Sequence, residues 1–473
     1  MISYVINPEV PQSYVASLYE FIYRKLILPQ REEYAGISRT TSQTELSLTY
    51  TVVDSLGNRK LKIQATGDKP IDVSITPLIE TVSKEEISKA REDIDIVVDL
   101  FEQQVRNNTL FFAWREGESI VPESTSGKQN KSLRRIFLET QIMLMVAFMA
   151  VGLILFYFIG PLVAIVLLAI QFVFVFYSNK IIARSADWHI TESNPMIHLL
   201  EYPLPLDDAD SIKKIPRDQL VNLKKEVYEK TIAEKGELEA KAAHEIFSKY
   251  GIECKPENFM TRKVDVYHLV KGIADKFGFP MPEVVVSNTL VPNAAASGPS
   301  PGRGVVLTTT GLFAQLEDNE IQSVLGHEFG HLKGHDPLWL YGLSAVQYLL
   351  WFYVIFALFP TSSVFLLFIY LWALATVTYF IAKFFEARAD LISAIVIGQP
   401  QVLADALEKI GFQRLLYERM PSFRVQEWLS LDPHPPIYFR IDRLRKLGVV
   451  TKISHPLIQS AREVAAGFVH SFS

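Results

Sequence analysis

A metal-binding pattern lies in the second half of the chain, in residues 326–331 (GHEFGH). In a helix, residues i and i+4 lie one above the other, so His327 and His331 can present two imidazoles to one zinc ion. Glu328 would then face a metal-bound water and act on it as a base. The segment therefore predicts the geometry by which zinc peptidases activate water. His335 extends the same face one turn further on, and we expect it to be solvated or to lie behind the ligands.

A catalytic zinc site needs a third protein ligand, because three ligands leave the fourth position open to water. We expect this ligand to be Glu386, in the segment 383–390 (KFFEARAD). Asp390 lies one turn beyond Glu386 and could accept a hydrogen bond from the second ring nitrogen of a zinc-ligating histidine. The competing interpretation is an ordinary charged patch at the end of a membrane helix. The preceding H-E-x-x-H pattern favours the ligand interpretation.

A long uncharged run separates the two histidines from Glu386. It covers residues 337–382, and about 46 residues would form a helix of about 69 Å at 1.5 Å per residue. This length is roughly twice the ~30 Å hydrocarbon core of a bilayer, so we expect two spans with a break near residues 359–363 (FPTSS). A hairpin of two spans leaves the membrane on the side where it entered, which returns Glu386 to the histidines.

A second uncharged run, residues 140–179, is divided by Gly160-Pro161 and predicts another pair of spans. Basic residues flank both hairpins at the ends away from their uncharged turns: Lys131, Arg134, Arg135, Lys180, Arg184, Lys333, Lys383 and Arg388. Positive charge marks the cytoplasmic side. We therefore expect a multi-pass protein of the cell membrane, with both termini and the zinc site facing the cytoplasm.

The composition excludes several other classes of protein. A net charge of −5 over 473 residues gives no signature of nucleic-acid binding. Cys254 is the single cysteine, so the chain forms no intramolecular disulfide and no thiolate zinc cluster. Residues 1–31 lack the pattern of a cleaved signal peptide, and we expect the internal spans to direct membrane insertion.

The first 130 residues predict a soluble α+β domain. Apolar and polar residues alternate over residues 46–52, 61–65 and 71–75, which is typical of an antiparallel meander. Ser83 and Glu86 form a capping-box pattern that opens a helix running to about Arg106. Two interpretations of this domain stay open: a regulatory or substrate-presenting module, and a purely structural addition.

The segment between the hairpins contains a loop of small residues that suits peptide binding. Its residues Asn293, Ala294, Ala295 and Ala296 would let an edge strand approach an extended peptide closely, as in strand addition to a sheet. Further along, Asp318 and Glu320 place negative charge where the zinc helix should begin.

The chain resembles the family of integral-membrane gluzincin peptidases that includes the HtpX-type quality-control proteases and the CAAX prenyl proteases. The resemblance is densest over residues 267–336, with Asn293-Ala294, Gly298, residues 310–313 (TGLF) and the HEFGH helix. It resumes at residues 386–390 and at residues 434–436 (HPP) with Arg440. Four spans are closer to the HtpX type. Ala295 departs from the aromatic residue common in that type, and the first 130 residues lie outside the resemblance.

The resemblance implies a role for each matching residue. His327, His331 and Glu386 are the implied ligands of one Zn²⁺ per chain, Glu328 the general base, and Asp390 the carboxylate behind a ligand. His434, in Asp432-Pro433-His434, is the implied donor to the oxyanion, and Arg440 would orient the peptide or the oxyanion. His455, which a proline also follows, lacks a second proline and an arginine at the matching interval.

The sequence thus predicts an α-helical membrane protein with about four transmembrane helices, a mainly α zinc-protease domain with a small β element, and an extra N-terminal α+β domain. The predicted parts are residues 1–130, 131–184 (first hairpin), 185–336 (first protease part), 337–382 (second hairpin) and 383–473 (second protease part). The expected function is zinc-dependent cleavage of misfolded or unassembled membrane proteins. Processing of prenylated or other lipid-associated peptides is the alternative. A zinc-binding scaffold without activity would lack the base or a ligand, and none is lacking.

Overall fold

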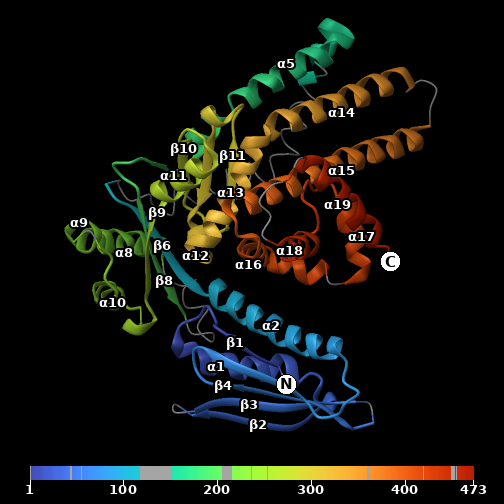
Figure 1. Cartoon of the computed structure of the whole chain (residues 1–473). Coiled ribbons are helices and arrows are strands. Elements are labelled where there is room, and N and C mark those ends of the chain that lie inside the picture. The colour runs from blue at the N-terminus through green and yellow to red at the C-terminus, as the bar shows by residue number, and fades with distance from the viewer. Residues whose placement is uncertain are drawn as a thin grey trace. The chain divides into compact units, whose positions relative to one another are not determined.

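The structure is a computed structural model that describes all residues except 1, 43–44, 55, 118–150, 153, 205–215, 236, 253, 359–362, 419, 449–452, 454 and 473. The chain divides into two compact units (Figure 1). The first comprises Met1–Phe112 and Leu200–Thr261, and the second Ala113–Leu199 and Arg262–Ser473. The five domain ranges expected from the sequence stay predictions.

The first unit is built on a five-stranded sheet of order β1-β5-β4-β3-β2, whose neighbouring strands are all antiparallel. Alternation sets its two faces: Leu61, Ile63 and Ala65 are buried, whereas Lys62 and Gln64 between them are exposed. The buried face shares one core with two helices, α1 and α2. The elements are β1 (Ile2–Ile6), α1 (Val15–Ile22), β2 (Tyr34–Ser42), β3 (Glu45–Val53), β4 (Arg59–Thr66), β5 (Ile71–Pro77) and α2 (Lys84–Asn107). The predicted meander and the Ser83 capping box are confirmed.

Further helices of the first unit are α8 (Arg217–Lys230), α9 (Ile232–Lys235) and α10 (Ala240–Lys249). A second sheet, of order β6-β8-β9, consists of strands in which the chain passes from one unit to the other. Its strands are β6 (Thr109–Arg115), β8 (Met196–Pro203) and β9 (Met260–Asp265).

The second unit is mainly helical and contains every expected zinc-site residue. Its helices are α5 (Val163–Phe176), α6 (Ser178–Ser185), α11 (Val266–Phe277), α12 (Thr310–Gln315), α13 (Asp318–Gly334), α14 (Asp336–Leu358), α15 (Val364–Ile397), α16 (Pro400–Glu418), α17 (Pro421–Leu429), α18 (Ile437–Lys446) and α19 (Pro456–His470). A four-stranded sheet of order β11-β12-β10-β7 accompanies them: β7 (Trp188–Ile190), β10 (Glu283–Ser287), β11 (Ala294–Ser297) and β12 (Val305–Thr309).

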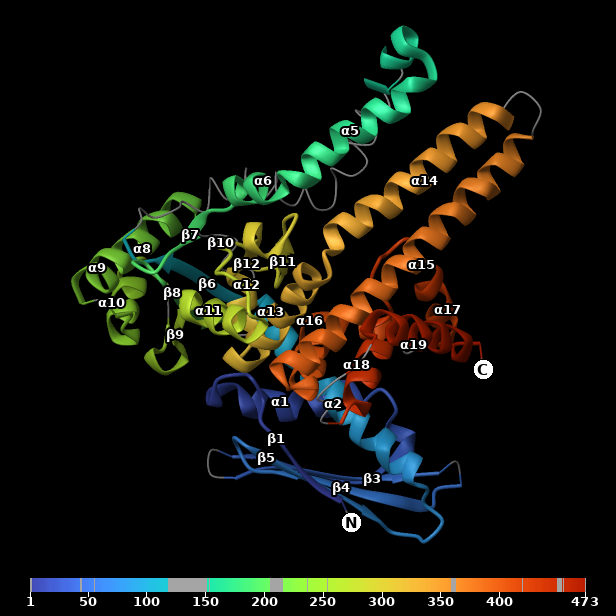
Figure 2. The same ribbon diagram turned by 45° about the horizontal axis from the view of Figure 1, so that its top comes forward.

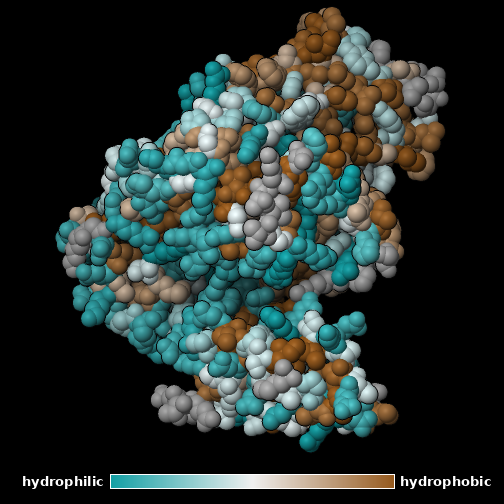
Figure 3. Space-filling model, in the orientation of Figure 1, coloured by the Kyte–Doolittle hydropathy of each residue, from teal (hydrophilic) through white to brown (hydrophobic). Residues whose placement is uncertain are grey.

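Two helical runs among the described residues are long and apolar enough to cross a bilayer, Ile154–Phe176 and Val364–Ile397. Only 22% and 6% of their most apolar windows are buried, so most of their apolar surface is not covered by the described part of the chain. Figure 3 shows hydrophobic residues gathered over the part of the second unit that contains α5, α14 and α15. Helix α14, which ends at Leu358, runs beside α15, which begins at Val364 (Figure 2). The predicted break at residues 359–363 lies, except for Ser363, outside the described residues. Residues 140–150 of the first hairpin lie outside the described residues, and four spans are not confirmed.

Two glycines bring α13 and α15 into close contact. A Cβ atom added at Gly326 would lie 2.6 Å from Ile397 Cγ1 and 2.8 Å from Ser393 Oγ. One added at Gly330 would lie 3.0 Å from both the Cα and the carbonyl oxygen of Ala389. The glycines occupy i and i+4, so they form one face of α13. At Gly330 the two helices therefore meet almost backbone to backbone, beside the motif histidines.

We expect Gly330→Ala to impair zinc retention. The new methyl group would clash with the α15 backbone, which cannot adopt another rotamer as a side chain can, and would push α15 and its Glu386 away from α13. Overpacking of this kind costs about 1–3 kcal/mol. The measurement is zinc content together with thermal unfolding of the purified protein. Gly342→Ala on α14 is the control, since a Cβ there meets nothing within 4 Å. Full zinc content and unchanged stability of Gly330→Ala would contradict the proposed close contact.

Candidate metal centre

Helix α13 begins where its charge pattern predicts. Glu317 is the N-cap residue and forms a capping box with Glu320, whose carboxylate accepts a 2.8 Å hydrogen bond from the Glu317 backbone N–H. Asp318 and Glu320 lie in the first turn, where negative charge interacts favourably with the helix dipole. The predicted start of the helix is confirmed, and the motif histidines follow on its buried side.

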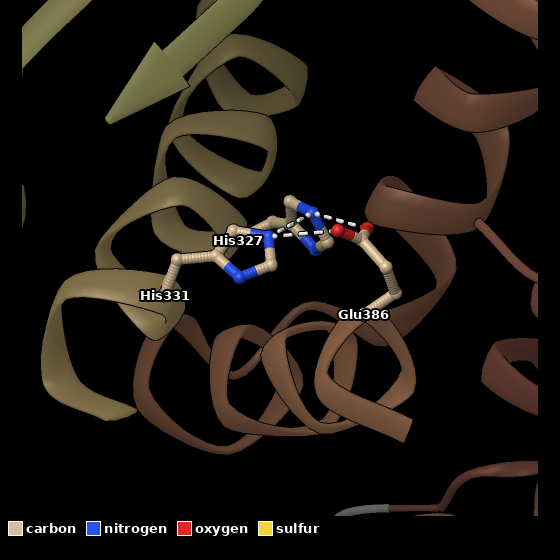
Figure 4. A group of neighbouring side chains, drawn as sticks. All are labelled: His327, His331 and Glu386. Atoms are coloured by element: carbon tan, nitrogen blue, oxygen red, sulfur yellow. Dashed lines mark hydrogen bonds and ion pairs between the residues drawn. The ribbon is translucent and has the colours of Figure 1, made fainter. Parts of the chain in front are cut away.

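Three side chains converge from α13 and α15 (Figure 4). The Nε2 atoms of His327 and His331 lie 3.1 Å apart. Glu386 Oε2 lies 3.5 Å from His327 Nε2, and Glu386 Oε1 lies 3.4 Å from His331 Nε2. One ligand atom from each residue falls within 4.8 Å of the others. The structure thus brings together the three residues expected to hold the metal.

The donor set fits zinc. Two imidazole nitrogens and one carboxylate form a typical catalytic zinc set, which leaves a coordination position for water. Glu386 is 7% exposed, and its Oε2 atom accepts no hydrogen bond from the described residues. A buried carboxylate oxygen without such a partner is costly, and a bound cation would satisfy it.

A carboxylate lies behind each histidine. Asp390 Oδ1 lies 2.8 Å from His327 Nδ1, and Asp336 Oδ2 lies 2.8 Å from His331 Nδ1. These contacts favour the tautomer with a proton on Nδ1 and free Nε2 for the metal. The sequence interpretation included Asp390 but missed Asp336. The sequence signal for Asp336 was its position five residues after His331, directly before the uncharged run.

Each of these carboxylates is in turn paired with an arginine. Arg440 donates to both oxygens of Asp390, at 2.8 and 2.7 Å, and Arg388 contacts Asp336. Burial alone would lower the pKa of Arg440, but the Asp390 carboxylate raises it above its usual value. Arg440 therefore stays charged and fixes Asp390 bidentately. The structure places Arg440 behind the site, in contact with the carboxylate that orients His327.

The electrostatics of the site favour a cation. Burial alone would lower the pKa of His327, but Asp390 and Glu386 raise it to about 10. The pKa of His331 is lowered, with burial as the largest cause. The two rings face each other, so they do not both hold a proton easily. At His327 the carboxylates of Asp390 and Glu386 outweigh burial, and these carboxylates favour positive charge beside the ring.

Glu328 lies between the site and the edge strand β11. Its Oε2 atom accepts a 3.0 Å hydrogen bond from the backbone N–H of Ala296. Strand β11 pairs with β12 on one side and is the edge of its sheet. The Ala296 N–H points to Glu328 and not into the sheet. The predicted edge strand thus lies beside the expected base.

The ends of β11 are fixed by local contacts. Before the strand, the Asn293 N–H donates to Thr309 Oγ1 at 2.9 Å, and the Asn293 carbonyl accepts from the Thr309 N–H at 3.1 Å. After it, Gly298 has φ 142, and a Cβ there would lie 2.3 Å from the Arg303 carbonyl oxygen. Only glycine fits this close approach. Ala294 and Ala295 pair with Thr308 and Leu307 within the sheet.

His434 reaches the same centre from the loop before α18. Its Nε2 atom lies 3.5 Å from Glu386 Oε2, and its Nδ1 atom lies 2.7 Å from Asp432 Oδ1. The side chain is 46% exposed, so it borders the open side of the site.

Two other histidines lie elsewhere. His335 is exposed and caps the end of α13 in a left-handed conformation with φ 53, so the helix face does not continue to it. His455 is the exposed N-cap residue of α19.

An H-E-x-x-H helix joined to a glutamate on a second helix defines the class of helical zinc metallopeptidases. The model of peptidase family M48 matches residues 261–448. A protease HtpX homolog from Pyrococcus abyssi (strain GE5 / Orsay) is 33% identical over 214 residues, which cover 39% of this chain and 74% of that protein. A protease HtpX homolog from Tropheryma whipplei (strain Twist) is 28% identical over 210 residues, covering 39% and 72%.

The chain belongs to peptidase family M48 and is a membrane zinc metalloprotease of the HtpX type. The resemblance inferred from the motifs is thereby confirmed. Among solved structures, the crystal structure of S. mikatae Ste24p matches with 19% identity and a TM-score of 0.31, covering 38% of this chain and 50% of that chain.

We expect Asp336→Asn to weaken zinc binding about 10- to 100-fold, the usual effect of losing a carboxylate behind a ligating histidine. The measurement is competition with a chelator of known affinity. Asp442→Asn is the control, because Asp442 makes an exposed pair with Lys446 on α18. Equal zinc affinity of Asp336→Asn and the wild type would contradict a role for Asp336 in orienting His331.

Proposed function

We propose that the protein is an endopeptidase that hydrolyses peptide bonds with one zinc ion held by His327, His331 and Glu386. The observation that carries this proposal is the convergence of these three donors with Glu328 beside them. When bound, the zinc ion supplies Lewis-acid polarisation of the scissile carbonyl and acidifies the attacking water.

The protein's own residues transfer the proton and align the substrate. Glu328 takes the proton of the attacking water and passes it to the leaving amine. Strand β11, with Asn293, Ala294, Ala295 and Ala296, aligns an extended substrate by strand addition. The Ala296 N–H, which donates to Glu328, places this strand directly beside the base.

His434 and Arg440 complete the proposed site. The His434 Nε2 atom donates to the oxyanion that forms on the scissile carbonyl, and its position 3.5 Å from Glu386 supports this role. Arg440 acts through Asp390 and so helps to orient His327, in addition to any effect on the peptide.

We propose substrates among misfolded or unassembled membrane proteins, cut near the cytoplasmic surface. The apolar helices α14 and α15 support this proposal, because α15 passes directly from its apolar part into Glu386. We further propose that the chain crosses the cell membrane four times, with both termini in the cytoplasm. Processing of prenylated peptides uses the same catalytic residues, and turnover on matched peptides with and without a prenyl group distinguishes the two.

We expect Glu328→Gln to abolish proteolysis and to keep zinc, because Glu328 acts as base and not as ligand. Zinc content and peptide cleavage of the purified variant are the two measurements. Glu386→Ala is the matched comparison and should lose both zinc and activity. Near-complete zinc loss from a folded Glu328→Gln protein would refute the assignment of the base.

We expect His434→Ala to lower kcat about a hundredfold with zinc retained, since one oxyanion donor contributes about 10²–10³ in turnover. His455→Ala is the control and should be close to silent. Steady-state kinetics of folded, zinc-loaded proteins decide the point. A larger effect of His455→Ala than of His434→Ala would show that the wrong histidine has been assigned.

A further inference from the structure

Lys383 is a fully buried cation one helix turn before Glu386. Its exposed fraction is 0%, which is unusual for lysine unless its charge is satisfied. Its Nζ atom donates to two backbone carbonyls of the His434 loop, that of Asp432 and that of His434, the latter at 3.3 Å. The residue that begins the charged segment after the membrane hairpin is therefore bonded to the loop that carries His434.

The side chains of the same loop are held from another direction. Asp432 Oδ1 accepts a 2.8 Å hydrogen bond from the His434 backbone N–H and lies 2.7 Å from His434 Nδ1. Asp432 Oδ2 accepts from Arg414 Nη1 at 2.7 Å, and Arg414 also pairs with Glu427 at 2.6 Å. Pro433 and Pro435 restrict the backbone on either side of His434. The imidazole ring of His434 therefore has little rotational freedom.

We propose that Lys383 is a positioning residue for the peptidase reaction: it fixes the Asp432–His434 loop to α15, so that one helix sets both the ligand Glu386 and the direction of His434. This inference rests on the oxyanion role proposed for His434.

The physical argument is that an oxyanion donor acts through its exact direction and distance. A misplacement of about 1 Å can lower turnover about a hundredfold. His434 is 46% exposed and bonded at Nδ1 to its own loop, so its Nε2 position follows the position of that loop. Lys383 lies on α15, the helix that carries Glu386, and its side chain donates two hydrogen bonds to backbone carbonyls of that loop. Loss of these bonds leaves His434 intact but frees the loop.

The test is a double-mutant cycle of Lys383→Met and His434→Ala in the full-length, zinc-loaded protein. Methionine keeps most of the side-chain volume and removes the donors. We expect Lys383→Met to lower kcat about 10- to 100-fold, with KM within about twofold and zinc content unchanged. In the His434→Ala background it should change kcat by less than about threefold, because coupled residues are not additive. Lys383→Arg, which keeps donors, should recover most of the turnover.

Lys446→Met is the control, because Lys446 makes an exposed ion pair with Asp442 on its own helix at 2.6 Å; it should leave kcat within about threefold. If Lys383→Met does not fold, Lys383→Gln takes its place in the same cycle. A full additional loss in the His434→Ala background overturns the inference while leaving the oxyanion role intact. Normal turnover of His434→Ala overturns both.

Discussion

The close contact between α13 and α15 is the constraint on which the metal centre depends. Gly330 packs directly on the α15 backbone at Ala389, and Gly326 leaves room for the α15 side chains of Ile397 and Ser393. At this separation the carboxylate of Glu386 comes within 3.5 Å of both imidazoles, and Asp390, one turn on, reaches His327 Nδ1. A wider spacing would separate the ligand from the histidines and the supporting carboxylate from its ring at the same time. The site therefore depends on the glycines of the motif as well as on its histidines.

The charges around the centre form a buried network of matched pairs. Asp390 is held by Arg440, Asp336 by Arg388, and Lys383 by two carbonyls of the His434 loop. An unpaired charge buried in this way would cost several kcal/mol, so each partner stabilises the charge that it contacts. Because α15 carries both apolar membrane-type sequence and Glu386, the network joins the site directly to the membrane-associated part of the second unit.

Much of the centre could be predicted from sequence, because its spacing follows helix geometry. The i, i+4 histidines, the return of Glu386 after a hairpin and the edge strand at 294–297 all derive from local patterns. The partners that depend on tertiary contacts could not be derived in this way. Lys383 resembles a basic residue flanking a span, and its burial depends on a loop 49 residues further on. The resemblance implied that Arg440 orients the peptide or the oxyanion, whereas the structure pairs it with Asp390. The meander of the first unit was predictable, since alternation determines register.

The central claim is that two histidines of α13 and one glutamate of α15 hold a single zinc ion. X-ray absorption at the zinc edge of the purified, full-length protein tests it most directly, because imidazole rings give a distinct multiple-scattering signal. The account predicts one zinc per chain with two imidazoles and the remaining ligands oxygen. A third imidazole in the fit, from His335 or His434, or a sulfur ligand from Cys254, would contradict it.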